Sequence, residues 1–256
     1  MQTARQTGWM VVRQARNLMR EPIWIAMMVI QPMLWLILYG QLFSKVTPLR
    51  AGAGSYVEFL TPGIVCMNAF FGGTWAGMAM ISDLDRHVVD RFLAAPASRL
   101  AIVLSQVIRA GITAILQALI LLVVGLALGV RVHGGFAGWV VVLAASFLLA
   151  MVFAGFSNGI ALVLRREASM IATANFVGLP LMFLSSILVS VALMPGWIRA
   201  IARFNPVNWG VDAARNAVVV GGNWGSAMGH LGLLLAAAAA TALFATWCFR
   251  SYQRSI

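Results

Sequence analysis

The sequence predicts an all-α integral membrane protein with six transmembrane helices, in a single domain over residues 1–256. Of the 256 residues, 61% are hydrophobic and only 10% are charged, and the mean hydropathy is +0.90. A soluble domain of this size could not bury so much apolar surface, so the lipid bilayer is the expected solvent. Apolar runs such as IAMMVIQPMLWLILYG do not alternate with polar residues, as the strands of a membrane barrel would. We therefore expect helices, which satisfy their own backbone hydrogen bonds in lipid.

Six segments are poor in charge and long enough to cross about 30 Å of hydrocarbon as helices. The predicted spans are residues 22–44, 59–82, 104–130, 139–164, 168–192 and 226–249. Pro32 lies inside the first span, where we expect it to kink the helix. Arg109 leaves two alternatives: it marks the membrane surface, because residues 110–130 alone could span, or it lies inside the membrane. The first is favoured, since a guanidinium inside the bilayer costs about 2.5–3.5 kcal/mol on insertion scales.

The basic residues predict that both termini lie in the cytosol, because Arg and Lys are more frequent in the segments on that side. Those expected inside are Arg5, Arg13, Arg16, Arg20, Arg86, Arg91, Arg99, Arg165, Arg166, Arg250 and Arg254, and those expected outside are Lys45, Arg50, Arg131, Arg199, Arg203 and Arg215. The net charge of +11 thus follows mostly from topology, and its scatter between spans argues against a nucleic-acid partner. Arginine far outnumbers lysine, which suggests a GC-rich bacterial genome and a location in the bacterial plasma (inner) membrane.

Two amphipathic segments are expected on the cytosolic side. Residues 1–21 place Trp9 among several arginines, which is typical of an interfacial helix that faces anionic lipid. Residues 83–96 carry an apolar stripe and a face with both signs of charge. The stripe contains Leu84, Val88 and Phe92, and the charged residues are Asp83, Asp85, Arg86 and Asp90. Such a helix suits a groove in a partner protein, although a solvated loop fits the pattern equally well.

Residues 193–223 predict two short re-entrant helices on the outer side, before the sixth span. In the first, Trp197 begins an apolar face, and Asn205 and Pro206 are typical of the cap and first residue of the second. Two such apolar helices are expected to dip into the outer leaflet. Asp212 and Arg215 lie three residues apart, so we expect them to pair and neutralise each other. A purely structural cap is the alternative.

A polar face on the third span is the candidate substrate path. Gln106, Arg109, Thr113 and Gln117 follow one another at helical spacing, so their side chains share a face that should point into protein or an aqueous path. The path residues we predict are Gln106, Thr113, Gln117, Asn68 and Phe71. Hydrogen bonds between helices are the alternative role of these polar groups.

The chain lacks the usual sources of energy for transport. Spans 1, 2, 4, 5 and 6 contain no Asp or Glu, which disfavours a carrier coupled to protons or ions. A phosphate-binding P-loop requires a lysine within G-x-x-x-x-G-K-[ST], and the only lysine, Lys45, does not lie in such a sequence. Any ATP must therefore be hydrolysed by another protein. We expect no catalytic residue, bound cofactor or metal site in this chain, because the three histidines lie in separate segments.

Three stretches carry a resemblance to a known family: DLDRHVVDRFLAAPASRLAIVLSQ, GIALVLRREASMIATANFVGLPLMFLSSILV and MPGWIRAIARFNPVNWGVDAAR. In this order they resemble the membrane subunits of type 2 ATP-binding cassette (ABC) exporters, and most the permeases of the daunorubicin-resistance type. The resemblance covers essentially the whole chain. The sequence HVVD at 87–90 departs from the glycine, threonine and glutamate that relatives often have there.

The resemblance implies a role for each unusual segment. Residues 1–21 would contain the connecting helix, and 83–96 the coupling helix, which docks on an ATPase through Asp83, Leu84, Asp85, Arg86, Val88, Asp90 and Phe92. The outer gate would contain Pro195, Trp197, Asn205, Pro206, Trp209, Asp212 and Arg215. The implied partners are a second copy of this permease or a close homologue, and two copies of an ABC ATPase subunit that binds ATP and Mg²⁺.

The implied activity is efflux of a hydrophobic or amphipathic compound, such as a drug or antibiotic. Within the same architecture, the alternative cargo is a lipid-linked glycan or a lipid. From other classes, the alternatives are a secondary carrier that needs no ATPase and a structural membrane protein that moves nothing.

Overall fold

The computed structural model describes residues 22–46, 53–85, 99–219 and 222–253. Within these ranges every regular element is a helix, which confirms the all-helical prediction. The elements are α2 (Pro22–Leu42), α3 (Tyr56–Thr74), α4 (Ala76–Asp85), α6 (Arg99–Ala127), α7 (Gly135–Leu164), α8 (Glu167–Phe183), the 3₁₀ helix η2 (Val191–Leu193), α9 (Gly196–Ala202), α10 (Pro206–Val218) and α11 (Trp224–Gln253). The predicted interfacial helix, residues 1–21, lies outside the described residues.

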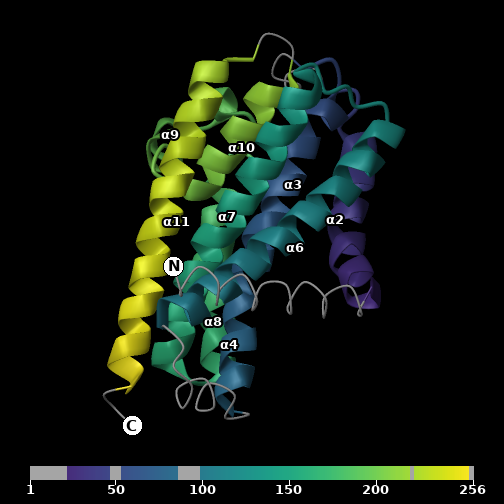
Figure 1. Cartoon of the computed structure of the whole chain (residues 1–256). Helices are drawn as coiled ribbons and strands as arrows, with labels where there is room; N and C mark the ends of the chain where they lie inside the picture. The colour runs from purple at the N-terminus through teal and green to yellow at the C-terminus, as the bar shows by residue number, and fades with distance from the viewer. Residues whose placement is uncertain (1–21, 47–52, 86–98, 220–221, 254–256) are drawn as a thin grey trace.

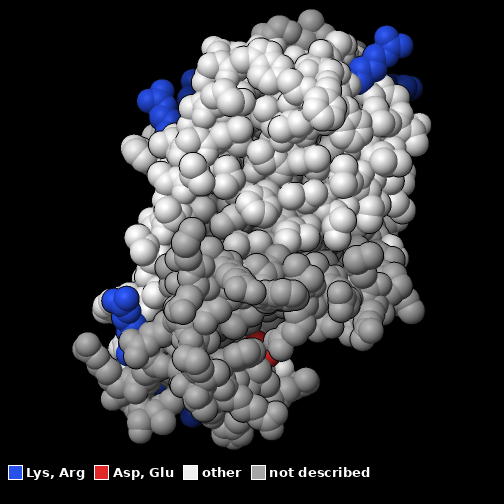
Figure 2. All heavy atoms as spheres, viewed as in Figure 1, with Lys and Arg blue, Asp and Glu red and all other residues white. Residues whose placement is uncertain are grey.

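The long helices run side by side, with α2 and α11 at opposite edges of the view in Figure 1. α9 and α10 lie at one end of the molecule, called here the α10 end. α4, α8 and the last turns of α11 lie at the other, the α4 end (Figure 1). On the face shown in Figure 2, the blue Lys and Arg atoms lie toward the two ends, and the described surface between them is uncharged. This distribution suits a belt of lipid around the middle of the molecule.

Helix α7 is the centre of the bundle and packs against α11, α3, α6 and α10. Glycines allow these helices to approach closely. A Cβ at Gly73 of α3 would lie 2.5 Å from the carbonyl oxygen of Ala150, and one at Gly155 of α7 would lie 2.7 Å from the hydroxyl oxygen of Thr241. Small residues at helix contacts are the usual means of close packing in lipid, where no hydrophobic effect drives helices together.

Among the described residues, four helical segments are long and apolar enough to cross a membrane: Tyr56–Asp85, Val103–Ala127, Gly135–Leu164 and Trp224–Ser251. They correspond to the predicted second, third, fourth and sixth spans. The first and fifth predicted spans are represented by shorter apolar helices, Val29–Leu42 and Glu167–Phe183. The membrane character of the chain is therefore supported, while the count of six spans stays a prediction.

The predicted fifth span, residues 168–192, is helical only in its first part. α8 ends at Phe183, and turns and bends follow up to η2. Asn205 of α10 donates hydrogen bonds to two carbonyl oxygens at this end of α8, and the hydroxyl of Ser185 donates to a third. Because side chains satisfy these carbonyl groups, the helix can end here without burying unpaired acceptors. The prediction of one helix to residue 192 is wrong for this reason.

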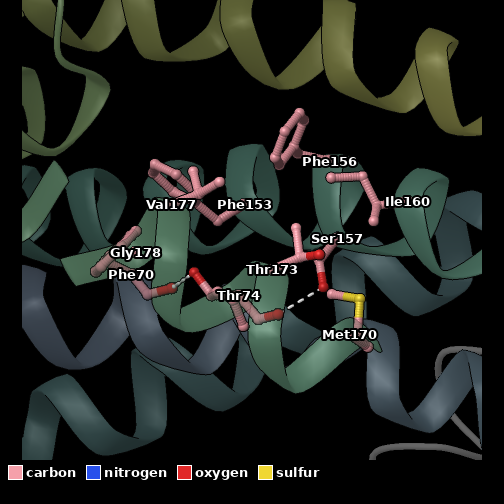
Figure 3. Close-up of a pocket in the computed structure, with 11 residues that line it drawn as sticks. Phe70, Thr74, Phe153, Phe156, Ser157, Ile160, Met170, Thr173, Val177 and Gly178 are labelled. Atoms are coloured by element: carbon pink, nitrogen blue, oxygen red, sulfur yellow. Dashed lines mark hydrogen bonds between the residues drawn. The ribbon is translucent and has the colours of Figure 1, made fainter. Parts of the chain in front are cut away.

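The second span has an irregularity at Trp75, between α3 and α4. Ser157 of α7 bridges it. The hydroxyl group donates to the carbonyl oxygen of Thr74 (Figure 3). It also accepts a hydrogen bond of 2.9 Å from the backbone N–H of Gly77. The backbone carbonyl of Thr74 and the N–H of Gly77 are therefore hydrogen-bonded inside the protein. Such pairing is needed in a membrane, because lipid offers no hydrogen-bond partners. α4 then continues to Asp85, so the structure shows no helix end at residue 83, where the predicted cytosolic helix was expected to begin.

Candidate functional site

A cavity of about 500 Å³ lies between α2, α3, α6 and α8. This volume falls within the range of about 300–1,000 Å³ that is common for small-molecule sites. We call it the amide cavity. Its lining consists of Gln31, Pro32, Trp35, Met67, Asn68, Phe71, Gly72, Trp75, Gln117, Leu179, Met182 and Phe183. None of these residues carries a charge, and most of the lining is aromatic, aliphatic or methionine.

The buried polar part of the cavity is a pair of amides, and the exposed Gln31 adds a third amide to the lining. The Nδ2 of Asn68 on α3 donates a hydrogen bond of 3.0 Å to the Oε1 of Gln117 on α6. Both side chains are nearly inaccessible to solvent, at 9% and 2% exposure. The bond therefore fixes the orientation of both amides in the cavity wall.

The structure brings together only some of the predicted path residues. Asn68, Phe71 and Gln117 line the amide cavity. Gln106 instead donates a hydrogen bond of 2.9 Å to Asp83, and Thr113 donates to a carbonyl of its own helix. Contact of any of them with a substrate stays a prediction.

Sequence reasoning found Phe71 but missed the rest of the apolar part of the cavity. Trp35, Trp75, Met182 and Phe183 line it, but none was predicted to. In a membrane protein an aromatic or methionine residue does not stand out from its neighbours. Trp75 lies at the irregularity of the second span, and Phe183 lies at the early end of α8. Both features depend on contacts between distant segments, which a local sequence pattern does not show.

A polar cluster at the α10 end joins α8 and the segment after it to α10. We call it the α10 cluster, and its members are Ser186, Asn205, Asn208, Asp212 and Arg215. Asn208, Asp212 and Arg215 lie on α10, Asn205 is the N-cap residue that precedes it, and Ser186 lies in the non-helical segment after α8.

Asn205 serves two helices at once. Its side-chain oxygen accepts a hydrogen bond of 3.0 Å from the backbone N–H of Val207, so it caps α10 as predicted, and Pro206 begins the helix. Its Nδ2 donates to the carbonyl oxygens of Leu181, at 2.7 Å, and Leu184, at 3.1 Å. Because α8 also supplies Leu179, Met182 and Phe183 to the amide cavity, Asn205 connects the cavity wall to α10.

Asp212 and Arg215 do not form the direct ion pair that their spacing predicts. Asp212 accepts hydrogen bonds from Asn208, at 2.9 Å, and from the hydroxyl of Ser186, at 3.4 Å. Arg215 donates to the carbonyl oxygens of Ser186, at 2.9 Å, Ile187 and Phe59, and its guanidinium carbon lies 3.7 Å from the centre of the Phe59 ring. Backbone carbonyl groups close to Arg215 thus take the bonds expected for the carboxylate.

Burial shifts the pKa of both Asp212 and Arg215. The two residues lie outside the helical segments that are long enough to cross a membrane. Burial lowers the pKa of Arg215 to about 10, which Asp212 partly opposes, so the guanidinium stays protonated at neutral pH. Burial likewise raises the pKa of Asp212, and Arg215, His230 and two hydrogen bonds oppose the shift.

The remaining predicted gate residues lie around α9. Pro195 precedes α9, and Trp197 on α9 is 64% exposed. Trp209 donates a hydrogen bond of 2.7 Å from its indole to the carbonyl oxygen of Arg203, which ties α10 to the end of α9. The exposed face of Trp197, Ile201 and Phe204 has no partner among the described residues, as expected for a helix against lipid.

A buried carboxylate at the α10 end was not predicted. Glu58, in the first turn of α3, is 5% exposed, and its Oε1 lies 3.0 Å from Nδ1 of His133. The same imidazole nitrogen lies 3.3 Å from the carbonyl oxygen of Val218, at the end of α10. Ser55 followed by Glu58 is the sequence pattern of a helix capping box, which could have signalled this helix start.

At the α4 end, the predicted docking residues divide into two groups. Asp83 accepts a hydrogen bond from Gln106, and Leu84 packs against a buried cluster of α4, α6, α7, α8 and α11, whereas Asp85 is exposed. Arg86, Val88, Asp90 and Phe92 lie outside the described residues. Among the residues that are described, no group of three or more His, Cys, Asp or Glu side chains is placed to hold a metal ion.

Comparisons with known proteins agree with this arrangement. The family described as ABC-2 type transporter matches residues 5–219. The putative transport permease ycf38 of Cyanophora paradoxa is 32% identical over 209 residues, which cover 80% of this chain and 71% of the relative. The daunorubicin resistance ABC transporter permease protein DrrB1 of Streptomyces coeruleorubidus is 26% identical over 238 residues, which cover 91% of this chain and 80% of the relative. The chain therefore belongs to the ABC-2 type transporter permease family.

Proposed function

We propose that this chain forms the substrate path of an ABC exporter that moves a hydrophobic or amphipathic compound out of a bacterial cell. The amide cavity is the observation that carries the proposal. Its lining offers a large apolar surface and a few amides, which suits a ligand with many apolar atoms and few hydrogen-bonding groups. The similarity to a daunorubicin resistance permease supports a drug-like substrate rather than a glycan.

A separate ATPase subunit supplies the energy in this proposal. ABC-2 permeases typically work with such a subunit, and the sequence of this chain contains no P-loop. Two ATPase copies, each with ATP and Mg²⁺, would act on two permease copies in the plasma membrane, with the permease termini in the cytosol. They would dock at the α4 end, on the segment that begins with the exposed Asp85.

The α10 cluster would form part of the outer gate. Asn205 binds the last turn of α8, and this turn contributes three residues to the amide cavity. A movement of α8 would therefore move the first turn of α10. This connection provides a route from the cavity to the outer end of the protein.

The experiment that tests the function is reconstitution of this chain with its ATPase subunit in proteoliposomes. We expect hydrophobic drugs to stimulate ATP hydrolysis and to be transported only with ATP and a catalytically intact ATPase. Stimulation by lipid-linked glycans alone would replace the proposed cargo. Transport driven by an ion gradient without ATP would contradict the proposal and favour a secondary carrier.

A further inference from the structure

We infer that Arg215 is a two-position switch at the α10 end, and that a row of five aromatic rings links its position to the amide cavity. In this structure the guanidinium binds carbonyl groups and the ring of Phe59, and in the second position it would pair with Asp212. The row, called here the aromatic ladder, consists of Trp35, Tyr39, Phe43, Tyr56 and Phe59. The role of this switch in an outer gate rests on the proposed function.

The aromatic ladder runs without a break from the cavity wall to the α10 cluster. Trp35 lines the cavity, and its ring is stacked on that of Tyr39, with centres 4.8 Å apart and planes 2° from parallel. The further ring contacts are Tyr39 to Phe43 at 5.7 Å, Phe43 to Tyr56 at 5.7 Å and Tyr56 to Phe59 at 6.0 Å. Rings at such distances attract one another. The ladder thus passes from α2, through the turn after it, to the start of α3.

The last ring of the ladder holds Arg215. The guanidinium carbon lies 3.7 Å from the centre of the Phe59 ring, and the guanidinium also donates to the carbonyl oxygen of Phe59. Because Phe59 is only 1% exposed and protein interiors are closely packed, its ring cannot shift without moving the groups around it. A displacement of Phe59 would therefore weaken two contacts of Arg215 at once.

Arg215 has a second partner within reach. Asp212 lies three residues earlier on α10, at a spacing where side chains of opposite charge commonly pair. Ser186 separates the two charges in this structure, because its carbonyl oxygen accepts from Arg215 at 2.9 Å and its hydroxyl donates to Asp212 at 3.4 Å. In the second position, one strong charged hydrogen bond would replace several weaker bonds to neutral carbonyl groups. Two arrangements that balance in this way make a two-state element.

The movement would begin at the cavity. Pro32 lies inside α2 and lines the cavity, about one turn before Trp35. A proline lacks the backbone N–H and gives a helix a point at which it bends. A compound that displaces Trp35 would therefore move the second half of α2 and the ladder with it. Tyr56 also donates a hydrogen bond of 3.1 Å to the carbonyl oxygen of Leu188, in the segment whose carbonyl groups bind Arg215.

A double-mutant cycle tests the link without a ligand or an ATPase. Tyr39→Leu removes a ring from the ladder, and Asp212→Asn removes the second partner of Arg215. If the ladder holds Arg215 in its present position, Tyr39→Leu lets the guanidinium move to Asp212. Asp212→Asn should then lower the unfolding temperature of the full chain in detergent by about 2–4 °C more in the Tyr39→Leu background than in the native protein. Residues without a link would give additive shifts.

Two controls separate the ladder from general packing. Tyr39→Phe keeps the ring and loses only the hydroxyl group, so Asp212→Asn should act in this background as it does in the native protein. Phe244→Leu removes a ring from a stacked pair outside the ladder, formed with Phe156 at 6.1 Å, and its shift should simply add to that of Asp212→Asn. If Tyr39→Leu does not fold, Trp35→Leu breaks the ladder at its first ring and should give the same excess.

A native thiol provides a second readout at α10. Cys66 is buried, and a Cβ at Gly210 of α10 would lie 3.7 Å from its sulfur, so the thiol lies against the helix that carries the switch. Cys248→Ala leaves Cys66 as the only thiol in the chain. In native membranes, N-ethylmaleimide should alkylate Cys66 several-fold faster in the Tyr39→Leu variant than in Tyr39→Phe, because α10 shifts when Arg215 releases the carbonyl groups.

An excess in the ladder variants but in neither control, together with faster alkylation of Cys66, is the expected result. Additive shifts in the ladder variants would overturn the inference, as would an equal excess in Phe244→Leu or unchanged alkylation. These measurements use the permease alone. A chain that shows the excess but no ATP hydrolysis stimulated by drugs would contradict the proposed function alone, and a chain with such stimulation but additive shifts would contradict the inference alone.

Discussion

The Nδ2 of Asn205 lies 2.7 Å from the carbonyl oxygen of Leu181, and this contact joins the first turn of α10 to the last turn of α8. The same residue caps α10 with its other amide atom, so one side chain ends one helix and begins another. The two roles can be separated, because a serine keeps the cap and lacks the reach of the amide group.

Asn205→Ser and Asn205→Ala should therefore differ. The serine variant loses the donors to two carbonyl oxygens, which should cost about 1–3 kcal/mol of unfolding free energy. The alanine variant also loses the cap, which should cost about 1 kcal/mol more. The measurement is thermal unfolding of the purified protein in detergent, with Asn175→Ala on the exposed side of α8 as the control. A serine variant as stable as the native protein would show that the contact to α8 contributes nothing.

Arg215→Met should destabilise the α10 end more than Arg215→Lys. Methionine leaves the carbonyl groups of Ser186, Ile187 and Phe59 without their donor and removes the positive charge of Arg215 from beside Asp212. Loss of one partner from a buried charged network costs about 3–5 kcal/mol. The same unfolding assay should show partial recovery when Asp212→Asn is added, because the uncompensated charge is then removed. A double variant as unstable as the sum of both changes would mean that the two charges do not interact.

Ser157→Ala should destabilise the protein through the irregularity in the second span. The change leaves the carbonyl oxygen of Thr74 and the N–H of Gly77 without their bridging hydroxyl. This loss should lower the free energy of unfolding by about 1–3 kcal/mol. Ser146→Ala is the matched control on the same helix, because Ser146 is also buried but donates only to a carbonyl of its own helix. Equal effects of the two variants would show that the bridge has no special importance.

The sequence predicted what depends on local pattern. Apolar length located the helices, and Asn205 with Pro206 correctly predicted the start of α10. The end of α8 could not be predicted, because it depends on a side chain more than twenty positions along the chain. The direct pairing of Asp212 and Arg215 failed for a similar reason, since carbonyl groups from other segments reach Arg215 first. Gln117 was found from its polar face, whereas the cavity aromatics other than Phe71 gave no contrast in an apolar sequence.

The structure also changes how docking of the ATPase should be tested. The sequence pattern gives Asp83, Leu84 and Asp85 the same expected role. However, Asp83 holds Gln106 of α6, and Leu84 packs against the buried cluster at the α4 end. A change at either residue would disturb the fold of the permease itself. Only Asp85 of these three is exposed, so it is the position where association can be tested without that disturbance.

Asp85→Arg should therefore reduce co-purification of the ATPase subunit by several-fold and leave the unfolding temperature of the permease unchanged. We expect the Asp85 carboxylate to face a basic group on the partner, which the reversed charge would repel, and rim charges contribute mainly to the rate and register of association. Asp83→Asn is the comparison: it weakens the bond to Gln106 and should lower the unfolding temperature as well. Asp85→Arg with full co-purification and native ATPase stimulation would place the docking surface elsewhere, because no exposed charge at the end of α4 would then take part in the contact.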